Sequence, residues 1–375
     1  MSNIKVLAYY LPQFHPLPEN DKWWGKGFTE WVNVAKAKPL FRHHYQPKIP
    51  ADLGFYDLRL PESRDMQAEY AKQAGVSAFC YWHYWFGKGK RLMNFPFDEV
   101  LRLKRPNFPF CLAWANHSWY QKSWTSNNGI FNLSKSKLLI EQQYFGKEDY
   151  TNHFYEMLPA FQDDRYFKIN NRPVMVIFNP LGGKKGMFSP VTEFMDTWQA
   201  LTQKEGLQPF FFIGHCYTYE DLKLIREMNF DAINFSMHHI VFPIHKDHST
   251  LFKHFLSGIN SRIHIKPTII KYANAIKKMD VNLWNEEKIY PTIIPNWDHT
   301  PRSGNFGRVF QDSTPELFSK HIDSIFKRII NKAEENRIVF LKSWNEWGEG
   351  NYIEPDLKYG TQYIDVLAEV LSKYN

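Results

Sequence analysis

Two glutamates three positions apart, Glu346 and Glu349, are the residues of this sequence best placed to do chemistry. They follow a short apolar run, Ile338–Leu341, which is typical of a buried strand. Around them stand the aromatic, amide and acidic residues Trp344, Asn345, Trp347 and Glu354. Glycoside hydrolysis generally requires two carboxylates that flank the scissile bond, and flat aromatic rings stack on the apolar faces of sugars. The pattern therefore predicts a sugar-processing site.

These acidic residues also have structural interpretations. Glu349, with glycines on both sides, is compatible with a capping or surface role. Asp298 and Glu354 are compatible with structural hydrogen-bond acceptors. Glu346 lies between Asn345 and Trp347, where an acidic side chain needs either a partner or a function.

Eight short apolar runs recur along the chain, and each ends in polar or aromatic residues. Most are nearly continuous in apolar residues, as buried parallel strands are. The runs are Val6–Pro12, Val76–Trp85, Pro109–Asn116, Pro173–Pro180, Pro209–Cys216, Asp231–His238, Pro291–Asp298 and the run that begins at Ile338.

Helical patterns lie between several of these runs. They cover Leu60–Ala74, Lys147–Gln162, Val191–Glu205, Tyr219–Met228, Thr314–Asn331 and Gln362–Lys373. The alternation predicts an α/β fold, and eight parallel strands indicate one (β/α)8 TIM barrel domain over residues 1–375. An open doubly wound sheet is the alternative, although no Gly-rich phosphate turn follows the first strand.

Two connections are too long for simple crossovers. His117–Lys147 follows the third strand, and His239–Tyr290 follows the sixth and contains a predicted helix near Leu251–Ser261. In a barrel, such extensions form the wall of the active-site face.

In a barrel, the C-terminal ends of the strands gather on one face. The side chains expected there are mostly rings, amides and imidazoles, which carbohydrate recognition uses. We predict Glu346 and Glu349 to be catalytic, and the predicted substrate-binding residues are Tyr10, His15, Tyr81, His83, Tyr84, Trp85, Trp114, Asn116, His117, Asn179, His215, Asn234, His238, Trp297, Asp298, Trp344, Asn345, Trp347 and Glu354.

The histidines at the strand ends also allow a metal site. His83, His117, His215 and His238 are the candidate ligands. No HExxH or similarly close set is present, so the sequence predicts neither a metal nor a cofactor. A Ser/His/Asp triad has no support either, because the sequence lacks a G-x-S-x-G elbow.

The charge balance is basic, with a formal net charge of +7 and a pI near 9.0. The basic residues are spread along the chain without a nucleic-acid motif, which argues against nucleic acid as a partner. A basic surface suits an acidic glycan, a phosphate-bearing or lipid-linked substrate, or peripheral contact with the cytoplasmic membrane face. The expected partner is an oligosaccharide or polysaccharide, and no pattern indicates an oligomeric state.

The three cysteines, Cys80, Cys111 and Cys216, lie inside apolar runs. Their odd number predicts buried free thiols in a reducing compartment. The N-terminus has no signal-peptide pattern and no apolar run is long enough to span a bilayer. We therefore expect a cytoplasmic protein, or else a mature form from which a signal has been removed.

Four ordered motifs resemble the WbsX-type proteins, which are labelled glycosyltransferases of surface-polysaccharide clusters and are related to family-99 glycoside hydrolases. They are LAYYLPQFHPLPENDKWWGKGFTEW, FCYWHYWFGKGKRLM, CLAWANHSW and SWNEWGEGNYIEPD. The resemblance runs from about Lys5 to the C-terminus. It implies a (β/α)8 barrel related to enzymes that cleave internal α-mannosidic linkages with retention.

The resemblance also implies roles for the two glutamates. Asn345–Gly350 matches the N-E-W-x-E-G motif of the hydrolases. By that match Glu346 removes the proton of a sugar 2-hydroxyl, and a 1,2-anhydro sugar forms without a covalent enzyme adduct. Glu349 would be the general acid and then the base, so we predict a raised pKa for it. The sequence departs from the hydrolases at Gly348, where they commonly carry a bulkier residue.

Three hypotheses of function follow. The first is an enzyme of O-antigen or capsule metabolism that hydrolyses or transglycosylates an α-linked polysaccharide. The second is a sugar-nucleotide-dependent glycosyltransferase, against which stands the lack of a nucleotide-binding pattern or a DxD-type motif. The third is a glycan-binding barrel without catalysis.

Overall fold

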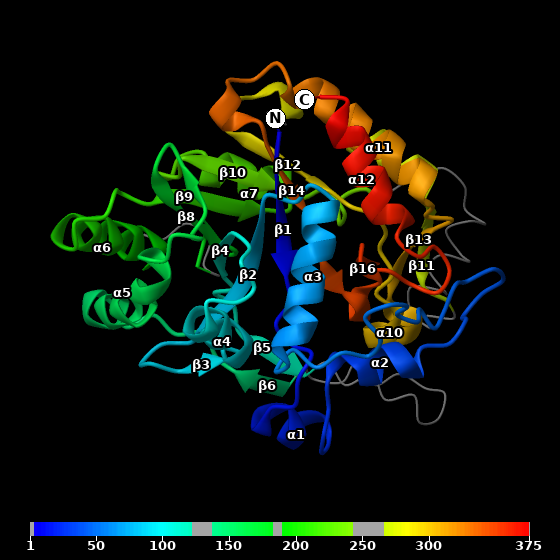
Figure 1. Ribbon diagram of the computed structural model, residues 1–375, viewed down its shortest axis with the longest axis horizontal. Helices are drawn as coiled ribbons and strands as arrows, with labels where there is room; N and C mark the ends of the chain where they lie inside the picture. The colour runs from blue at the N-terminus through cyan, green and yellow to red at the C-terminus, as the bar shows by residue number, and fades with distance from the viewer. Residues whose placement is uncertain (1–3, 122–136, 183–189, 243–265, 375) are drawn as a thin grey trace, which may run out of the picture.

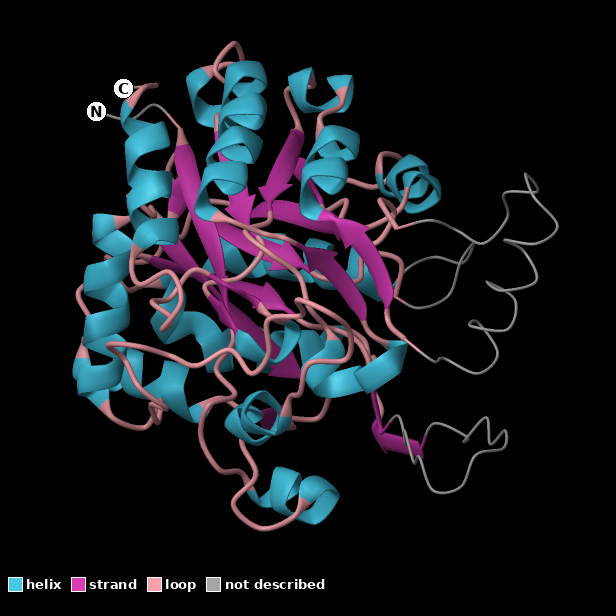
Figure 2. Ribbon diagram, turned by 90° about the vertical axis from the view of Figure 1, so that its right-hand side faces the viewer, coloured by secondary structure: helices cyan, strands magenta, loops and turns pink. Residues whose placement is uncertain are grey.

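A closed barrel of parallel strands forms the centre of the protein (Figures 1 and 2). The computed structural model describes residues 4–121, 137–182, 190–242 and 266–374. Within these ranges eight strands pair in chain order, and the pairing of the first with the second and the last closes the ring. They are β1 (Lys5–Tyr10), β2 (Ala78–Trp85), β4 (Phe110–Trp114), β8 (Arg172–Ile177), β9 (Phe211–Cys216), β10 (Ala232–Phe235), β12 (Ile289–Ile293) and β14 (Ile338–Leu341).

The predicted (β/α)8 barrel is therefore confirmed, and each of the eight apolar runs overlaps one barrel strand. The open doubly wound sheet is excluded because Leu7 and Ala8 of β1 pair both with β2 and with β14. The strands are buried along almost their whole length, as expected for strands with the barrel interior on one side and helices on the other.

Helices surround the barrel, and five of the six predicted helical patterns end within two residues of the observed helices. The exception is α7, which stops at Ile225 rather than Met228. Thr314 caps α11, because its hydroxyl accepts a hydrogen bond from the Leu317 amide at 3.3 Å. The covering helices are α3 (Pro61–Gln73), α4 (Phe95–Leu103), α5 (Lys147–Phe161), α6 (Pro190–Lys204), α7 (Tyr219–Ile225), α9 (Tyr272–Met279), α11 (Pro315–Ile329) and α12 (Gln362–Ser372).

Short elements gather at the C-terminal ends of the strands. Figure 1 shows β1 running from the edge where both termini lie toward α1 and the β5–β6 pair at the opposite edge. These elements are α1 (Pro18–Trp24), α2 (Glu30–Lys36), β5 (Trp119–Gln121), β6 (Lys137–Ile140), α10 (Thr300–Ser303), β15 (Asn345–Glu346), the turn η4 (Trp347–Glu349) and β16 (Asn351–Tyr352).

The predicted long connections follow β4 and β10. The described part of the first connection carries β5 and β6. The described part of the second carries α9 and β11 (Thr268–Lys271), and β11 pairs with β13 (Arg308–Gln311). The predicted helix at Leu251–Ser261 lies outside the described residues. The remaining short strands are β3 (Arg91–Leu92) and β7 (Lys168–Ile169), and the remaining 3-10 turns are η1 (Asn282–Asn285), η2 (Gly304–Phe306) and η3 (Glu334–Asn336).

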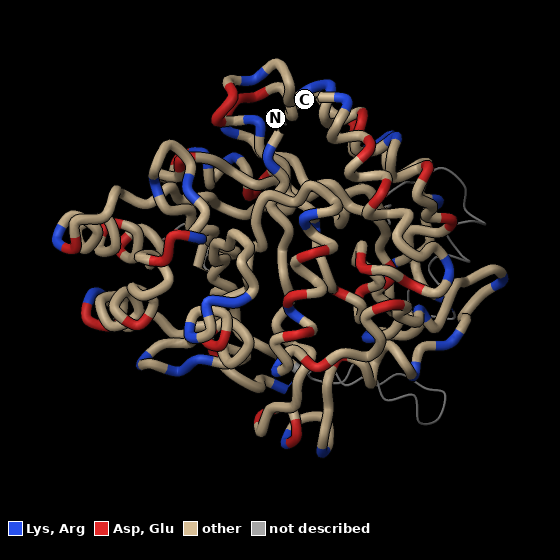
Figure 3. The backbone as a smooth tube through the Cα atoms, in the orientation of Figure 1, with Lys and Arg blue, Asp and Glu red and all other residues tan. Residues whose placement is uncertain are grey.

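The surface charge is dispersed. Figure 3 shows lysines and arginines on elements all around the barrel rather than in one band. The three cysteines are buried free thiols, as predicted. Within the described ranges, no helix combines the length and the hydropathy that crossing a bilayer requires.

Candidate active site

A cavity of about 640 Å³ lies at the C-terminal ends of the strands, and both Glu346 and Glu349 line it. Pockets of this size bury most of a small ligand, which fits a site for one or a few sugar rings. Aromatic side chains form much of its wall. They are Trp23, Trp24, Phe28, Trp82, Tyr84, Trp119, Tyr120, Phe178, Tyr217 and Trp297.

A small hairpin after β14 carries the two glutamates into the cavity. Glu346 lies on β15, which pairs with β16 in antiparallel fashion, and Glu349 ends the turn between these strands. The Asn345 side chain fixes the start of the hairpin, because its amide donates to the Leu11 carbonyl at 3.0 Å and its oxygen accepts from the Leu11 amide at 2.8 Å. Gly350 has φ +56°, which a residue with a side chain adopts at a cost.

Residues of other loops also bind the backbone of the hairpin. The Asp298 amide donates to the Glu349 carbonyl at 2.7 Å, and the Lys48 ammonium donates to the Gly350 carbonyl at 3.1 Å. Both of these contacts bind the backbone of the turn. They leave the carboxylate of Glu349 free to face the cavity.

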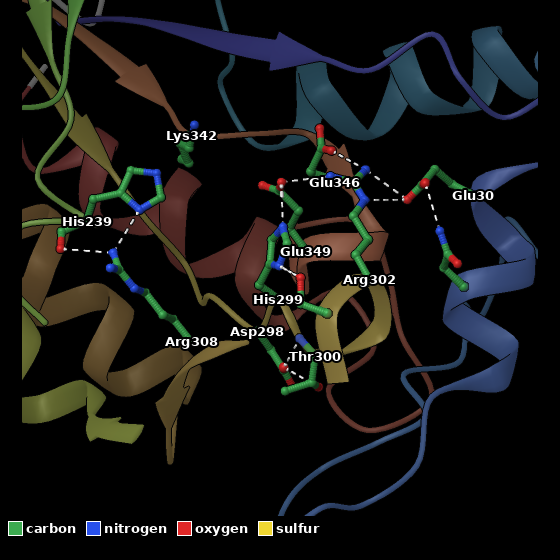
Figure 4. Close-up of polar contacts among 12 residues, drawn as sticks. Glu30, His239, Asp298, His299, Thr300, Arg302, Arg308, Lys342, Glu346 and Glu349 are labelled. Carbon is green, nitrogen blue, oxygen red and sulfur yellow. Dashed lines mark hydrogen bonds and ion pairs between the residues drawn. The ribbon is translucent and has the colours of Figure 1, made fainter. Parts of the chain in front are cut away.

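Arg302 of α10 joins three carboxylates (Figure 4). Its Nη2 donates to Glu346 Oε1 at 2.6 Å and its Nη1 donates to Glu349 Oε1 at 2.7 Å. Its Nε donates to Oε2 of Glu30, the first residue of α2, at 2.9 Å. Since one guanidinium reaches all three, the two predicted catalytic carboxylates face the same small volume.

The two catalytic candidates differ in their pKa values. Burial raises the pKa of Glu346 to about 7, helped by the nearby charges of Glu349 and Glu30 and opposed by Arg302. Burial acts in the same direction on Glu349, but Arg302, His299 and Lys342 outweigh it and hold the pKa of Glu349 well below its usual range. The predicted raised pKa of Glu349 is therefore wrong, because the sequence did not reveal the cations around this carboxylate.

Gly348 lies where the Glu30 carboxylate meets the turn. A Cβ at position 348 would collide with Glu30 Oε2 and come within 2.9 Å of Arg302 Nε. A residue with a side chain would therefore displace Glu30 or the guanidinium. The position at which this sequence departs from the hydrolase motif, Gly348, is thus the position that contacts the Glu30 carboxylate.

The family of the chain follows from its sequence. The family described as glycosyltransferase WbsX matches residues 6–367. The chain belongs to this WbsX family. It is also 30% identical over 370 residues to a protein described as uncharacterized protein WxcX from Xanthomonas campestris pv. campestris, with the same values for two strains. That match covers 98% of this chain, but this chain spans only about half the length of the curated relatives.

Solved structures share the fold of this WbsX chain. The GH99 endo-alpha-mannosidase from Bacteroides thetaiotaomicron, in complex with Bis-Tris propane, superposes with a TM-score of 0.55 at 14% identity, covering 100% of this chain and 98% of that one. A structure described as a glycoside hydrolase-like protein gives 0.54 at 14% identity, covering 99% and 94%. At this identity the likeness shows the barrel fold.

Of the predicted binding residues of the WbsX chain, four line the cavity. They are Tyr84, His117, His238 and Trp297. The His238 Nδ1 lies 2.9 Å from Ser236 Oγ, while its Nε2 and the Trp297 Nε1 have no hydrogen-bond partner among the described residues. Such side chains are suited to receive sugar hydroxyls.

Five predicted residues at strand ends point outward to the helices instead. The Tyr10 hydroxyl donates to Gln67 of α3 at 2.6 Å, and the others pack against residues of α4, α5 or α6. These others are Tyr81, His83, Trp85 and Trp114. Successive side chains of a strand alternate between its two faces, so the neighbouring Trp82 and Tyr84 face the cavity when Tyr81, His83 and Trp85 do not.

His215 and Asn234 lie deeper, inside the barrel. The Tyr9 hydroxyl of β1 donates to Asn234 Oδ1 at 2.9 Å and lies 3.3 Å from His215 Nδ1. Because β1 and β9 are on opposite sides of the ring, this network crosses the interior. Neither residue lines the cavity.

Several predicted binding residues hold the surrounding loops. The Asp298 carboxylate accepts hydrogen bonds from His44 and Gln46, each at 2.7 Å, and from the Thr300 amide at 3.0 Å. Asn116 binds the backbone of Asn179. Trp344 packs on Phe79 in the core, and the buried His15 likewise does not line the cavity.

Glu354 has the structural role that its sequence context allowed. Its carboxylate accepts from the Tyr56 hydroxyl at 2.8 Å, from Gln67 at 2.6 Å and from the Trp347 indole at 2.6 Å. Burial raises its pKa to about 7. Both Glu354 and Trp347 therefore brace the hairpin from outside the cavity.

Sequence reasoning missed the charged residues Glu30, Arg302 and Lys342, all of which line the cavity. Glu30 stands inside the first resembling motif, in GFTEW, and this was the available signal. Arg302 lies four residues beyond Asp298, the last residue predicted to bind substrate after the seventh strand. In the part of the chain that the structure describes, no group of three His, Cys, Asp or Glu side chains is arranged to hold a metal ion.

Proposed function

We propose that this chain is a carbohydrate-active enzyme of surface-polysaccharide metabolism that cleaves or transglycosylates an α-linked glycan with retention. The observation that carries this proposal is the pairing of Glu346 and Glu349 through Arg302 on the wall of an aromatic-lined cavity. Membership of the WbsX family supports glycan chemistry.

In the proposed reaction, Glu346 takes the proton of the sugar 2-hydroxyl. The freed oxygen attacks the anomeric carbon of its own ring while Glu349 protonates the departing glycosidic oxygen, and a 1,2-anhydro sugar results. Glu349 then removes a proton from water or from an acceptor hydroxyl, which opens the anhydro ring at the anomeric carbon. Glu346 returns its proton to the 2-oxygen. Two inversions at one carbon give overall retention.

The proposed order of protonation sets a condition on the substrate complex. In the structure the proton favours Glu346, because Arg302 and His299 stabilise the ionised Glu349. The general acid has to hold a proton before the glycosidic bond breaks. The proposal therefore requires a bound glycan to weaken the contact between Arg302 and Glu349.

A sugar-nucleotide-dependent glycosyltransferase is the second candidate, favoured by the description of the WbsX family. In that case the acceptor is a polysaccharide precursor, such as a lipid-linked glycan at the cytoplasmic membrane face. The same cavity would then receive the donor sugar.

Incubation with the surface polysaccharide of the producing organism, with and without sugar nucleotides, tests both candidates by mass analysis of the products. Shorter or rearranged glycans without added nucleotide support the first proposal, and products that depend on the nucleotide support the second. Glu346→Gln and Glu349→Gln, checked for unaltered thermal unfolding, are expected to abolish turnover. Unchanged turnover in both variants contradicts the assigned roles, and glycan binding without turnover by the wild type supports a binding barrel.

A further inference from the structure

Lys342 is a buried lysine that lines the cavity and forms no ion pair with a described carboxylate. It follows directly on β14, and the residue is 8% exposed. Its Nζ donates to the Tyr217 hydroxyl at 3.3 Å. Among the described residues, no Asp or Glu oxygen lies within ion-pair distance of this ammonium, although it carries three donor hydrogens.

The side chains nearest to the Lys342 ammonium are aromatic rings. Its ammonium lies 5.3 Å from the centre of the Tyr217 ring and 5.8 Å from that of Trp297. Cation–π contacts offset part of the desolvation of a buried ammonium. Burial lowers the pKa of His238, and the neighbouring His239 and Lys342 lower it further. The His238 imidazole is therefore neutral.

In the part of the chain that the structure describes, no carboxylate forms an ion pair with Lys342 or Arg308 on this side of the cavity. Arg308 of β13 lies beyond His239, where its Nη1 donates to the His239 carbonyl at 3.4 Å (Figure 4). On the other side of the cavity, Arg302 has Glu30, Glu346 and Glu349 as partners. Arg302 and Lys342 thus line the same cavity, but among the described residues only Arg302 has carboxylate partners.

Lys342 and Glu349 face one space. The charge of Lys342 is among the causes that lower the pKa of Glu349, so the two groups are within electrostatic reach, yet they form no ion pair. Figure 4 shows Lys342 on the side of Glu349 away from Arg302. A ligand group can therefore bind the ammonium while its sugar lies against the catalytic carboxylates.

We propose that Lys342 forms an anion-binding subsite that takes a carboxylate or phosphate group of the glycan substrate, so that this enzyme acts on an acidic glycan. The inference rests on the proposed function. Lysine binds such groups as a compact point charge, and the rings of Tyr217 and Trp297 offer flat surfaces for the sugar that carries the group. The anion would accept hydrogen bonds from a buried ammonium that has no carboxylate partner among the described residues.

Binding of small defined probes tests this subsite without turnover. The probes are methyl α-D-glucuronide, its neutral counterpart methyl α-D-glucoside, and inorganic pyrophosphate, titrated by NMR or calorimetry. We expect the wild type to bind at least one anion about tenfold more tightly than the neutral glycoside, the size of one charge-assisted hydrogen bond. Lys342→Met should abolish this preference and Lys342→Arg should retain most of it, while Lys320→Met, at an exposed helix position, should change nothing.

The outcomes separate the source of the anion and the two proposals. Lys342-dependent binding of the glucuronide indicates an acidic sugar, and Lys342-dependent binding of pyrophosphate indicates a phosphate-bearing substrate. Equal binding of charged and neutral probes by the wild type, or a preference that survives in Lys342→Met, overturns the subsite. If Lys342-dependent anion binding holds but no glycan is turned over, only the proposed reaction fails. If turnover depends on Glu346 but no anion preference exists, only the subsite fails.

Discussion

The Glu30 carboxylate occupies the space that a side chain at position 348 would need. Glu30 begins α2, and Gly348 lies in the turn between Glu346 and Glu349, so more than 300 positions of sequence separate them. Their contact lets the Arg302 guanidinium lie against Glu346, Glu349 and Glu30 at once. The shape of the turn and the charge of the site therefore depend on the same glycine.

Gly348→Ala should cost turnover more than stability. The added methyl group has to displace Glu30 or Arg302, which typically costs about 1–3 kcal/mol of folding free energy. We expect kcat/KM to fall by about 10–100-fold, because misplacing groups by an ångström has effects of this size. Denaturant unfolding and steady-state kinetics measure the two effects.

The double variant Gly348→Ala, Glu30→Ala is the control for this clash. It removes the carboxylate that the methyl group meets, so stability should recover while activity stays low. Additive losses of stability in the double variant would contradict direct contact between the two residues.

Arg302→Met should make stability strongly dependent on pH. The variant leaves three partly buried carboxylates without their cation, and breaking a buried pair costs about 3–5 kcal/mol. Without Arg302, the repulsion between Glu346 and Glu349 raises their pKa values, and carboxylates whose folded pKa is raised contribute less stability as the pH increases. The loss should thus be large at pH 8 and smaller at pH 5 in unfolding experiments, whereas Arg59→Met, in an exposed pair, should cost less than about 1 kcal/mol at both.

The pH dependence of kcat/KM should reveal Glu346. Its pKa of about 7 means that it is protonated in acid, so a base at this position becomes active as the pH rises through neutrality. We expect a rising limb near pH 7 that is absent from the residual activity of Glu346→Gln. A limb centred in the ordinary carboxylate range, near pH 4, would show that another group controls the step.

Substrates with an activated leaving group should distinguish the roles of the two glutamates. The dinitrophenolate of a dinitrophenyl glycoside leaves without needing a proton. On this substrate Glu349→Gln should therefore keep the rate of the first step within about tenfold of the wild type. Glu346→Gln lacks the general base and should lose about 10²–10⁴-fold. Burst kinetics of phenolate release measure this step. If Glu346→Gln is instead the variant that this substrate rescues, the two roles are exchanged, in agreement with the higher pKa of Glu346.

Glu354→Gln should affect folding rather than catalysis. Three donors converge on this carboxylate, and an amide offers them only one acceptor oxygen. We expect a loss of about 1–3 kcal/mol in unfolding free energy. The pH profile of kcat/KM should keep its limb near neutrality, since Glu354 lies outside the cavity.

The barrel could be predicted from sequence because its strands are continuous apolar runs, and such runs indicate buried strands without any knowledge of their neighbours. The same continuity concealed which side chains face the cavity. In AFCYWHYW of β2 both faces are buried, so the sequence shows no alternation that separates Trp82 and Tyr84 from Tyr81, His83 and Trp85. Glu30 and Arg302 lie on short loop helices far apart in sequence, and only the closed fold brings them to Glu346.

The place where the chain begins and ends has a practical consequence for measuring glycans. β1 starts and α12 finishes at one edge of the barrel, while the strands point toward the cavity at the other (Figures 1 and 2). Protein immobilised on a sensor through either terminus would therefore present the cavity to the solution. Long polysaccharides could reach Glu346 and Glu349 without crossing the support, whereas coupling through surface lysines, which surround the barrel, would orient the molecules at random.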